Sequence, residues 1–249
     1  MVAASPWGAG PHLASQRDRG SVRGVIPREL IATAVVPGHQ GQLRCYRHDG
    51  AYQIWLDRTE LMSSRVHDSE ELLADVVLQS LGARPAPRVL VGGLGMGFTL
   101  ARTLAGVDAQ ARVEVVELVP EIVAWNRDLY GHCAGHPLAD PRVHVTVGDV
   151  GAALADAAAA GAYDAILLDV DNGPEALVHP DNARLYAPPG LLAARAALRP
   201  GGVLGVWSSA EAPTFAGRLQ GCGFTVATHR TRARGHKGPR RTVWTAVRR

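Results

Sequence analysis

Three acidic residues, Glu117, Asp149 and Asp169, each come at or just after the end of a short apolar run that is typical of a buried strand. The carboxyl ends of parallel strands meet at one edge of a sheet, and open α/β sheets bind their ligands at that edge. A carboxylate at Glu117 could accept hydrogen bonds from both hydroxyls of a ribose, and one at Asp149 from the exocyclic amine of adenine. The series therefore predicts a nucleoside site, although each acid could instead cap the helix or turn that follows it.

A cluster of glycines precedes the first of these acids. Gly93, Gly95 and Gly97 follow the apolar run 89–92 and lead into a helical run at 98–104. Glycines let the chain turn sharply and let a ligand lie against bare main chain at a helix N-terminus, but a tight turn without a ligand has the same signature. The spacing is G-x-G-x-G and not the G-x-G-x-x-G of dinucleotide sites. We therefore expect an adenosyl sulfonium cofactor, S-adenosylmethionine or its decarboxylated form, in preference to NAD.

Asp169 is the candidate catalytic residue because the strand that it ends brings it to the reactive end of a cofactor bound at that edge. It could accept a proton from an attacking amine or hydroxyl, or hold a cationic nucleophile in place. Asp171 lies two residues on, and two nearby carboxylates can raise the pKa of one of them. The candidate residues for binding the acceptor are Asn172, Tyr186 and His67, although core packing and simple solvation are ordinary roles for a tyrosine and a histidine.

The composition of the 249 residues is that of an ordinary globular domain, with 47% hydrophobic and 20% charged residues. No apolar run approaches the roughly 20 residues that span a bilayer, and residues 1–25 lack the apolar centre of a signal peptide. We therefore expect a disordered leader, a cytoplasmic location and no membrane partner. Neither the three cysteines nor the ten histidines have metal-ligand spacing, so no metal site is predicted.

The segment after Glu211 contains nine basic residues and no acidic one, in a chain whose net charge is only +3. Such a segment could hold an anionic substrate or nucleic acid, or it could be a solvated face. It has no interleaved aromatic residue for base stacking before Trp244, so nucleic acid is the less favoured partner.

Strand and helix patterns alternate from residue 88 onward, which predicts a parallel doubly wound sheet. Strands are expected at 88–92, 112–117, 143–147, 163–169, 202–207, 224–230 and 242–247, and helices near 98–105, 120–130, 150–160, 189–198 and 213–220. No helix separates the last two strands, so they should form an antiparallel hairpin. The predicted fold class is α/β, a Rossmann-like seven-stranded class I methyltransferase sheet with a small N-terminal antiparallel β subdomain.

The N-terminal part has its own pattern. Three β-favouring runs at 30–36, 43–47 and 52–56 are separated by turn signals, and a helix follows that Asp68 could cap, with Glu71 completing a capping box. Pro85 and Pro87 then break the chain. We therefore divide the chain into a leader at 1–25, a β-hairpin subdomain with a linking helix at 26–84, and a Rossmann-like S-adenosylmethionine-binding catalytic domain at 85–249.

Taken together, the motifs resemble the spermidine synthase family, the polyamine aminopropyltransferases, within the wider S-adenosylmethionine-dependent methyltransferase superfamily. The matching segments lie between residues 43 and 247 and include Arg88–Gly93, Val116–Leu118, Gly148–Asp149, the strand 163–169 and Leu198–Gly202. The resemblance implies that Glu117 binds the ribose, that Asp149 with Val150 binds adenine, and that Asp169 activates the nucleophile. It further implies a homodimer and a cofactor site completed by Gly93, Gly95, Gly97, Leu118 and Gly148.

Two positions depart from the family's pattern on the acceptor side. The second acid of the fourth strand is replaced by Asn172, and the Tyr and His-Glu of the helix after the hairpin are missing near residues 74–76. Polyamines carry several positive charges and need acidic or aromatic walls. We therefore expect methyl transfer to a small-molecule or peptide nucleophile. Aminopropyl transfer from decarboxylated S-adenosylmethionine is the alternative, and a non-catalytic nucleoside-binding protein is a further one.

Overall fold

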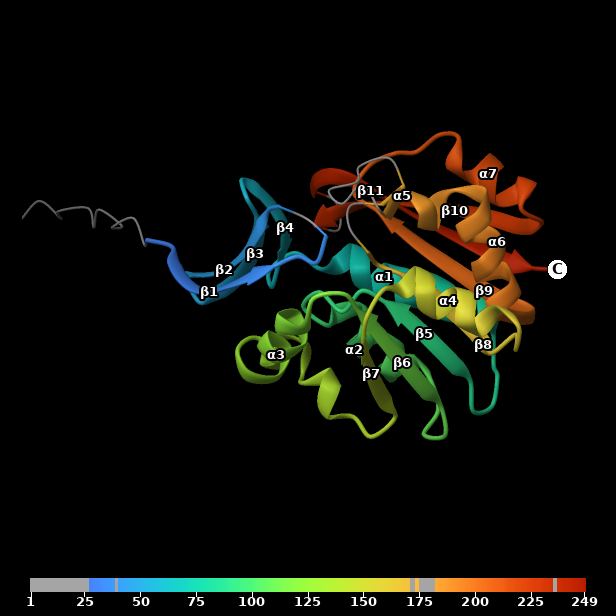
Figure 1. Ribbon diagram of the computed structural model, residues 1–249, viewed down its shortest axis with the longest axis horizontal. Coiled ribbons are helices and arrows are strands. Elements are labelled where there is room, and N and C mark those ends of the chain that lie inside the picture. Colours follow the sequence, from blue (N-terminus) through green and yellow to red (C-terminus); the bar gives the residue numbers. More distant parts are fainter. Residues whose placement is uncertain (1–26, 39, 171–172, 175–181, 235–236) are drawn as a thin grey trace, which may run out of the picture.

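The computed structural model describes residues 27–249 apart from 39, 171–172, 175–181 and 235–236. The described chain forms two sheets, a small one at one end of the molecule and a large one that carries most of the helices (Figure 1). Two of the predicted site residues, Asp171 and Asn172, lie outside the described residues, as does the segment 1–25.

The small sheet is an antiparallel meander of four strands in the order in which they follow one another. Its strands are β1 (Glu29–Val35), β2 (Gln42–His48), β3 (Ala51–Leu56) and β4 (Thr59–Ser63). The sequence predicts the first three. It gives no signal for β4, a five-residue strand with only two apolar side chains, which pairs with β3 across an irregular register. This missed strand supplies two side chains of the candidate site, Leu61 and Met62.

The large sheet has seven strands in the order β10-β11-β9-β8-β5-β6-β7, which confirms the predicted fold class. Pairing is parallel from β9 to β7, whereas β11 runs antiparallel to both of its neighbours. The strands are β5 (Arg88–Gly92), β6 (Arg112–Glu117), β7 (Val143–Val147), β8 (Tyr163–Leu168), β9 (Leu198–Ser208), β10 (Phe224–Arg234) and β11 (Lys237–Arg248). All six residues of the central β8 are buried, as expected for a parallel strand covered on both faces.

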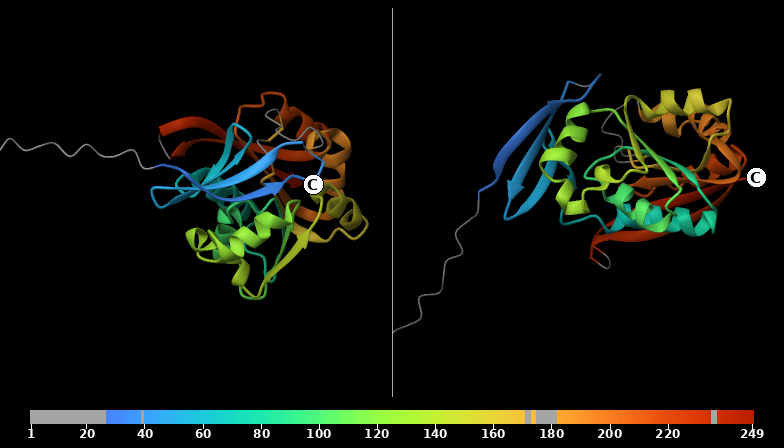
Figure 2. Two further views of the ribbon diagram at one scale, coloured as in Figure 1. Left: turned by 60° about the vertical axis from the view of Figure 1, so that its left-hand side comes forward. Right: turned by 90° about the horizontal axis from the view of Figure 1, so that it is seen from below.

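Helices cover both faces of the large sheet (Figure 2). Alternation along the strands decides which side chains face which layer: Val89 and Val91 of β5 pack with α1, α2 and α3, whereas Leu90 packs with α4, α6 and α7. The helices are α1 (Asp68–Leu81), α2 (Phe98–Gly106), α3 (Pro120–Asp128), α4 (Val150–Ala158), α5 (Ala183–Tyr186), α6 (Pro188–Ala197) and α7 (Phe215–Gly221), with short 3-10 turns η1 (Gly131–Ala134) and η2 (Pro137–Ala139). Among the described residues, no helix has the length and apolarity needed to cross a membrane.

Helix α1 links the two sheets and packs on the large one. A Cβ at Gly205 of β9 would lie 2.3 Å from Cγ2 of Val77 and 2.8 Å from Cδ1 of Leu73, so the absence of a side chain at Gly205 is what lets α1 lie so close to the strand. The helix begins one residue earlier than the sequence suggests, because His67 is its N-cap and Asp68 lies in its first turn. Glu71 consequently pairs with Nδ1 of His67 at 2.7 Å and does not complete a capping box.

We expect Gly205→Ala to lower the free energy of unfolding by about 1–3 kcal/mol, because the added methyl group overpacks the contact between α1 and β9. The matched control is Gly217→Ala on the exposed side of α7, where a Cβ meets nothing within 4 Å. This control should be neutral or stabilising, since alanine is the better helix former. Equal thermal denaturation midpoints for the two variants would contradict the packing argument.

Candidate active site

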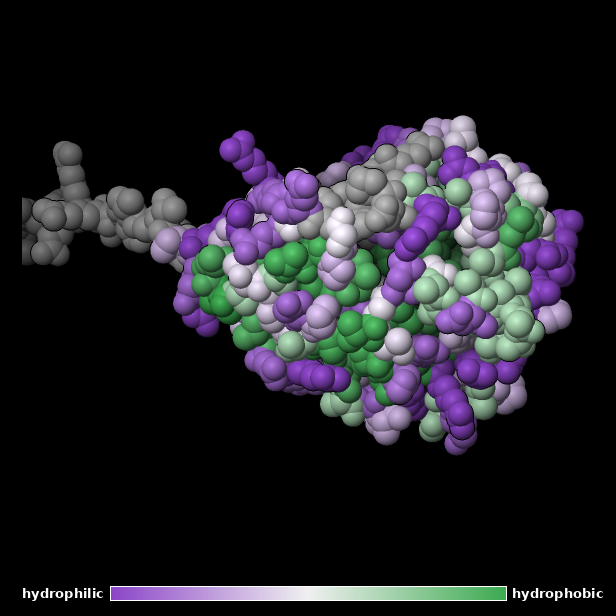
Figure 3. Space-filling model, in the orientation of Figure 1, coloured by the Kyte–Doolittle hydropathy of each residue, from purple (hydrophilic) through white to green (hydrophobic). Residues whose placement is uncertain are grey.

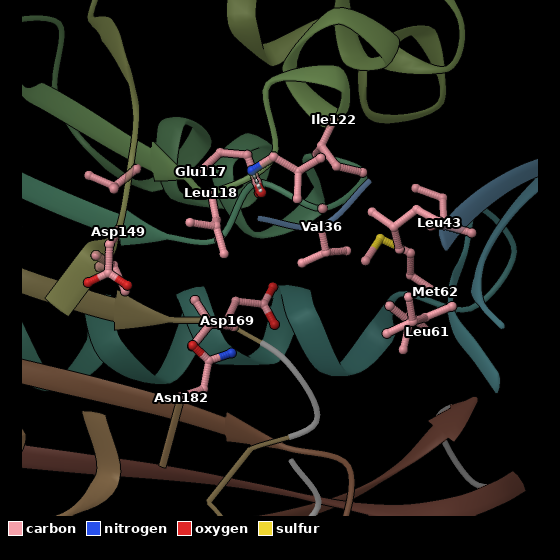
Figure 4. Close-up of a pocket in the computed structure, with 18 of the residues that line it drawn as sticks. Val36, Leu43, Leu61, Met62, Glu117, Leu118, Ile122, Asp149, Asp169 and Asn182 are labelled. Atoms are coloured by element: carbon pink, nitrogen blue, oxygen red, sulfur yellow. Dashed lines mark hydrogen bonds between the residues drawn. The ribbon is translucent and has the colours of Figure 1, made fainter. Parts of the chain in front are cut away.

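A cavity of about 870 Å³, part of it open to solvent, lies between the small sheet and the carboxyl ends of β5, β6, β7 and β8. In the space-filling view, apolar residues gather where the two sheets meet (Figure 3). Figure 4 shows Asp149 toward one end of the cavity, Glu117 and Asp169 in the middle, and Leu43, Leu61 and Met62 toward the other end. The cavity therefore has the mostly apolar wall with few polar groups that is typical of small-molecule sites.

The glycine cluster forms one wall of this cavity. Gly93, Gly95 and Gly97 have φ angles of 87°, 51° and 89°, a conformation that other residues rarely adopt. A Cβ at Gly93 would lie 2.3 Å from the carbonyl oxygen of Asp169, so only glycine lets β5 and β8 end side by side here. Gly93 and Gly95 line the large cavity, whereas Gly97 lines a smaller one next to it. The loop thus presents bare main chain to both.

Glu117 is buried at the end of β6 and lines the large cavity. One carboxylate oxygen accepts a hydrogen bond from the N–H of Leu94 at 2.8 Å, and the other accepts one from the N–H of Val119 at 2.9 Å. Burial raises the pKa of this carboxyl, while those backbone N–H groups oppose the rise. Each oxygen keeps a lone pair for a further donor, so the group can hold the glycine loop and a ribose diol at the same time.

Asp149 lies in the cavity wall with Gly148 and Val150, at the start of α4. One carboxylate oxygen caps that helix by accepting the N–H of Ala152 at 2.8 Å, and the other pairs with Arg184 at 2.6 Å. Leu118 completes the same wall from the end of β6. Asp149 therefore combines helix capping with a position in the cavity, and its predicted contact with adenine stays a prediction.

Asp169 follows β8 and lines both the large and the smaller cavity. Its backbone N–H donates to the carbonyl of Gly92 at 2.8 Å, and the hydroxyl of Thr99 donates to its carboxylate at 2.6 Å. Burial raises the pKa of Asp169 to about 6, although the hydrogen bond from Thr99 opposes the rise. A carboxyl with this pKa can accept a proton near neutral pH, which is the property expected of a general base.

Glu70 is the functional candidate that the sequence reasoning missed. It lies in the first turn of α1 and lines the smaller cavity together with Asp169. Burial and the nearby charge of Asp169 raise the pKa of Glu70 to about 7. Its helical spacing could have identified it from the sequence, because Glu70 shares a face of α1 with Leu73 and Val77, which are both buried. The sequence predicts Asp171 as a second carboxylate near Asp169. Among the described residues, it is Glu70 that shares a cavity wall with Asp169.

Two of the predicted acceptor-binding residues, Tyr186 and His67, are not among the residues that line these two cavities. Tyr186 is 1% exposed, donates its hydroxyl to the carbonyl of Val170 at 3.0 Å and packs edge-on against Phe215. It holds the chain next to Asp169 and is absent from the cavity walls described above, so the packing alternative applies. His67 stacks on Phe98 with ring centroids 3.9 Å apart, and Phe98 stands in the wall of the smaller cavity. His67 itself therefore lies behind that wall.

The strand order, the antiparallel β11 and the cavity at the strand ends together define the class I methyltransferase fold. No family model matches the chain. Two solved structures, a spermidine synthase with the transition state analogue AdoDATO and the spermidine synthase of Thermotoga maritima, match with a TM-score of 0.67 and 16% identity, over 88% of this chain and 72% of theirs. These structures share the fold of the chain.

The chain is also similar in sequence to putrescine N-methyltransferases 3 and 1 of Nicotiana tabacum, with 37% identity over 132 residues. The match covers 52% of this chain and 32% of each relative, so the chain spans about a third of the length of the curated relatives it matches. Both comparisons confirm the resemblance drawn from the sequence, to the spermidine synthase family within the class I methyltransferase fold.

The raised pKa of Glu70 has a consequence for stability. A carboxyl whose pKa rises from about 4.5 to about 7 on folding binds more protons in the folded state, so the folded protein loses stability as the pH rises through that window. We expect Glu70→Gln to be more stable than the unaltered protein above pH 7, because a buried charge is removed, with the difference vanishing below the lower value. Thermal unfolding from pH 4.5 to pH 8.5 measures this, and Glu71→Gln on the more exposed neighbour should show no such gain. A constant difference across the pH range would contradict the burial of a charge at Glu70.

Proposed function

We infer that the chain is an S-adenosylmethionine-dependent methyltransferase whose acceptor is the amine of a small molecule. The observation that carries this proposal is that Asp169 lines both cavities and shares the wall of the smaller one with the carboxylate of Glu70. The large cavity has the residues expected of a nucleoside site, and the smaller one has carboxylates that suit an amine. The sequence relatives, which are named putrescine N-methyltransferases, support the same assignment.

The residues of the large cavity fit S-adenosylmethionine. The bare main chain at Gly93 and Gly95 accommodates the amino-acid tail, Glu117 with Leu118 suits the ribose, and the wall Gly148–Val150 suits adenine. When bound, S-adenosylmethionine supplies a methyl group on a positively charged sulfur.

The acid pair suits a nucleophile that must lose a proton. An aliphatic amine is protonated at neutral pH and attacks only as the free base. Asp169 can accept that proton because its pKa is raised by burial, and Glu70 adds negative charge that attracts the ammonium form into the cavity. Orientation of the nucleophile by these two carboxylates supplies the remaining contribution of the protein to the rate.

Aminopropyl transfer is the second candidate, because the solved structures with the same fold are spermidine synthases. It would need decarboxylated S-adenosylmethionine in the same cavity. A nucleoside-binding protein without catalysis is a third candidate, and a peptide acceptor also stays open. The predicted cytoplasmic location, the homodimer, and the expectation of neither a metal nor a nucleic-acid partner remain predictions from the sequence.

The choice of cofactor distinguishes these candidates. We expect S-adenosylhomocysteine to form when the protein is incubated with S-adenosylmethionine and small amines, measured by chromatography coupled to mass spectrometry. If methylthioadenosine forms, and only from decarboxylated S-adenosylmethionine, the result would contradict methyl transfer and support aminopropyl transfer. If calorimetry shows that the cofactor binds but neither product forms, the result would support the third candidate, a nucleoside-binding protein without catalysis.

The role of Asp169 is tested by Asp169→Asn, which keeps the size of the side chain and removes the base. We expect the rate of transfer to fall by about 10²–10⁴-fold, the usual contribution of a general base. The matched control is Asp75→Asn, which removes an exposed carboxylate paired with Arg102 on the outer side of α1. An unchanged rate in Asp169→Asn, with the protein still folded, would exclude Asp169 as the proton acceptor.

A further inference from the structure

The acceptor side of the site changes charge along its length. Beyond Glu70 the smaller cavity continues into a third, of about 850 Å³ including open solvent, between β4, α1 and the hairpin of β10 and β11. The two share walls formed by Leu61, Met62, Ser63, Glu70 and Trp207. An acceptor that reaches Asp169 from outside therefore extends past Glu70 toward the basic C-terminal hairpin.

Arg241 on β11 lies at the outer part of this path. Its guanidinium is partly buried and lies 5.6 Å from the centre of the Trp207 ring. Its hydrogen bonds do not neutralise the charge of this guanidinium: Nη1 donates to the carbonyls of Ser209 at 3.0 Å and Arg240 at 3.3 Å. Within the described part of the chain, no carboxylate lies at ion-pair distance from Arg241. Burial accordingly lowers the pKa of this guanidinium, while the more distant Glu70 raises it.

The polar groups that a ligand would meet in the third cavity include other side chains besides Arg241. Arg234 adds a second, exposed cation to the wall, and the exposed carboxylate of Glu60, which accepts a hydrogen bond from Gln53 at 3.1 Å, adds an anion. The indole N–H of Trp207 is buried without an acceptor among the described residues. The outer part thus offers a ligand the guanidinium of Arg241, which has no ion-pair partner among the described residues, whereas the inner part offers the two carboxylates. A diamine suits the inner carboxylates but brings no anion to Arg241.

We propose that the acceptor is an amine that also carries a carboxylate, with the amine between Glu70 and Asp169 and the carboxylate at Arg241. This acceptor differs from the diamine in the names of the sequence relatives. The proposal deepens the proposed function and rests on it, since the same acid pair receives the amine. Guanidinium and carboxylate form strong charge-assisted hydrogen bonds, so Arg241 is the residue that sets this specificity.

The test measures binding and turnover separately. The unlabelled full chain, saturated with S-adenosylhomocysteine, is titrated by calorimetry with ω-amino acids of three to six carbons and with diamines of the same lengths. We expect the best ω-amino acid to bind at least about tenfold more tightly than its matched diamine, which corresponds to one charge-assisted hydrogen bond. Arg241→Gln should abolish this preference, and Arg241→Lys should retain part of it.

The matched control is Arg240→Gln, because the side chain of Arg240 pairs with Glu211 at the surface, outside the cavity. This variant should keep the preference of the unaltered protein, and thermal unfolding checks that all three variants fold. Equal or tighter binding of the diamines, a preference that survives in Arg241→Gln, or no binding of any of these compounds would overturn the proposal. Preferential binding of ω-amino acids that is lost in Arg241→Gln, without methyl transfer, would uphold Arg241 as a carboxylate site and overturn the proposed function.

Discussion

The close approach of β5 and β8 at their carboxyl ends is the constraint on which the rest of the site depends. Gly93 leaves β5 in the left-handed region and lies directly against the backbone of Asp169, where any side chain would collide. This contact places the glycine loop, Glu117 and the acid of β8 around one cavity. The same strand end brings the carboxylate of Asp169 to the hydroxyl of Thr99.

Burial then decides how the carboxylates behave. Glu117 is buried but has two backbone N–H donors, so it serves as a fixed acceptor that ties the glycine loop to the start of α3. Burial and the charge of Glu117 raise the pKa of Asp169 to about 6, and burial and the charge of Asp169 raise that of Glu70 to about 7. Burial thus raises the pKa of all three carboxyls, and they differ in their hydrogen bonds: two backbone N–H groups hold Glu117 in place, whereas Asp169 has the hydroxyl of Thr99 as its side-chain donor.

The small sheet and α1 convert a strand-end cavity into an enclosed path. Side chains of β4 stand in the walls of all three cavities, and α1 brings Glu70 beside Asp169 because Gly205 allows the helix to lie against β9. From the opposite side, β11 brings Arg241 to the outer end. The acceptor path is thus assembled from elements at both ends of the chain, around a cofactor cavity built from its middle.

The seven strands, the terminal hairpin, and the positions of Gly93, Glu117, Asp149 and Asp169 at strand ends could be predicted from the sequence, because strand patterns and glycine turns are local signals. It could not reveal β4, whose residues are mostly polar, or the packing of Tyr186 and His67 away from the cavity. The sequence did not predict that Glu70, Asp169 and Arg241 line cavities that share their walls. These residues are far apart in the chain, and their proximity results from the packing of α1 and β11 on the same sheet, which no local pattern encodes.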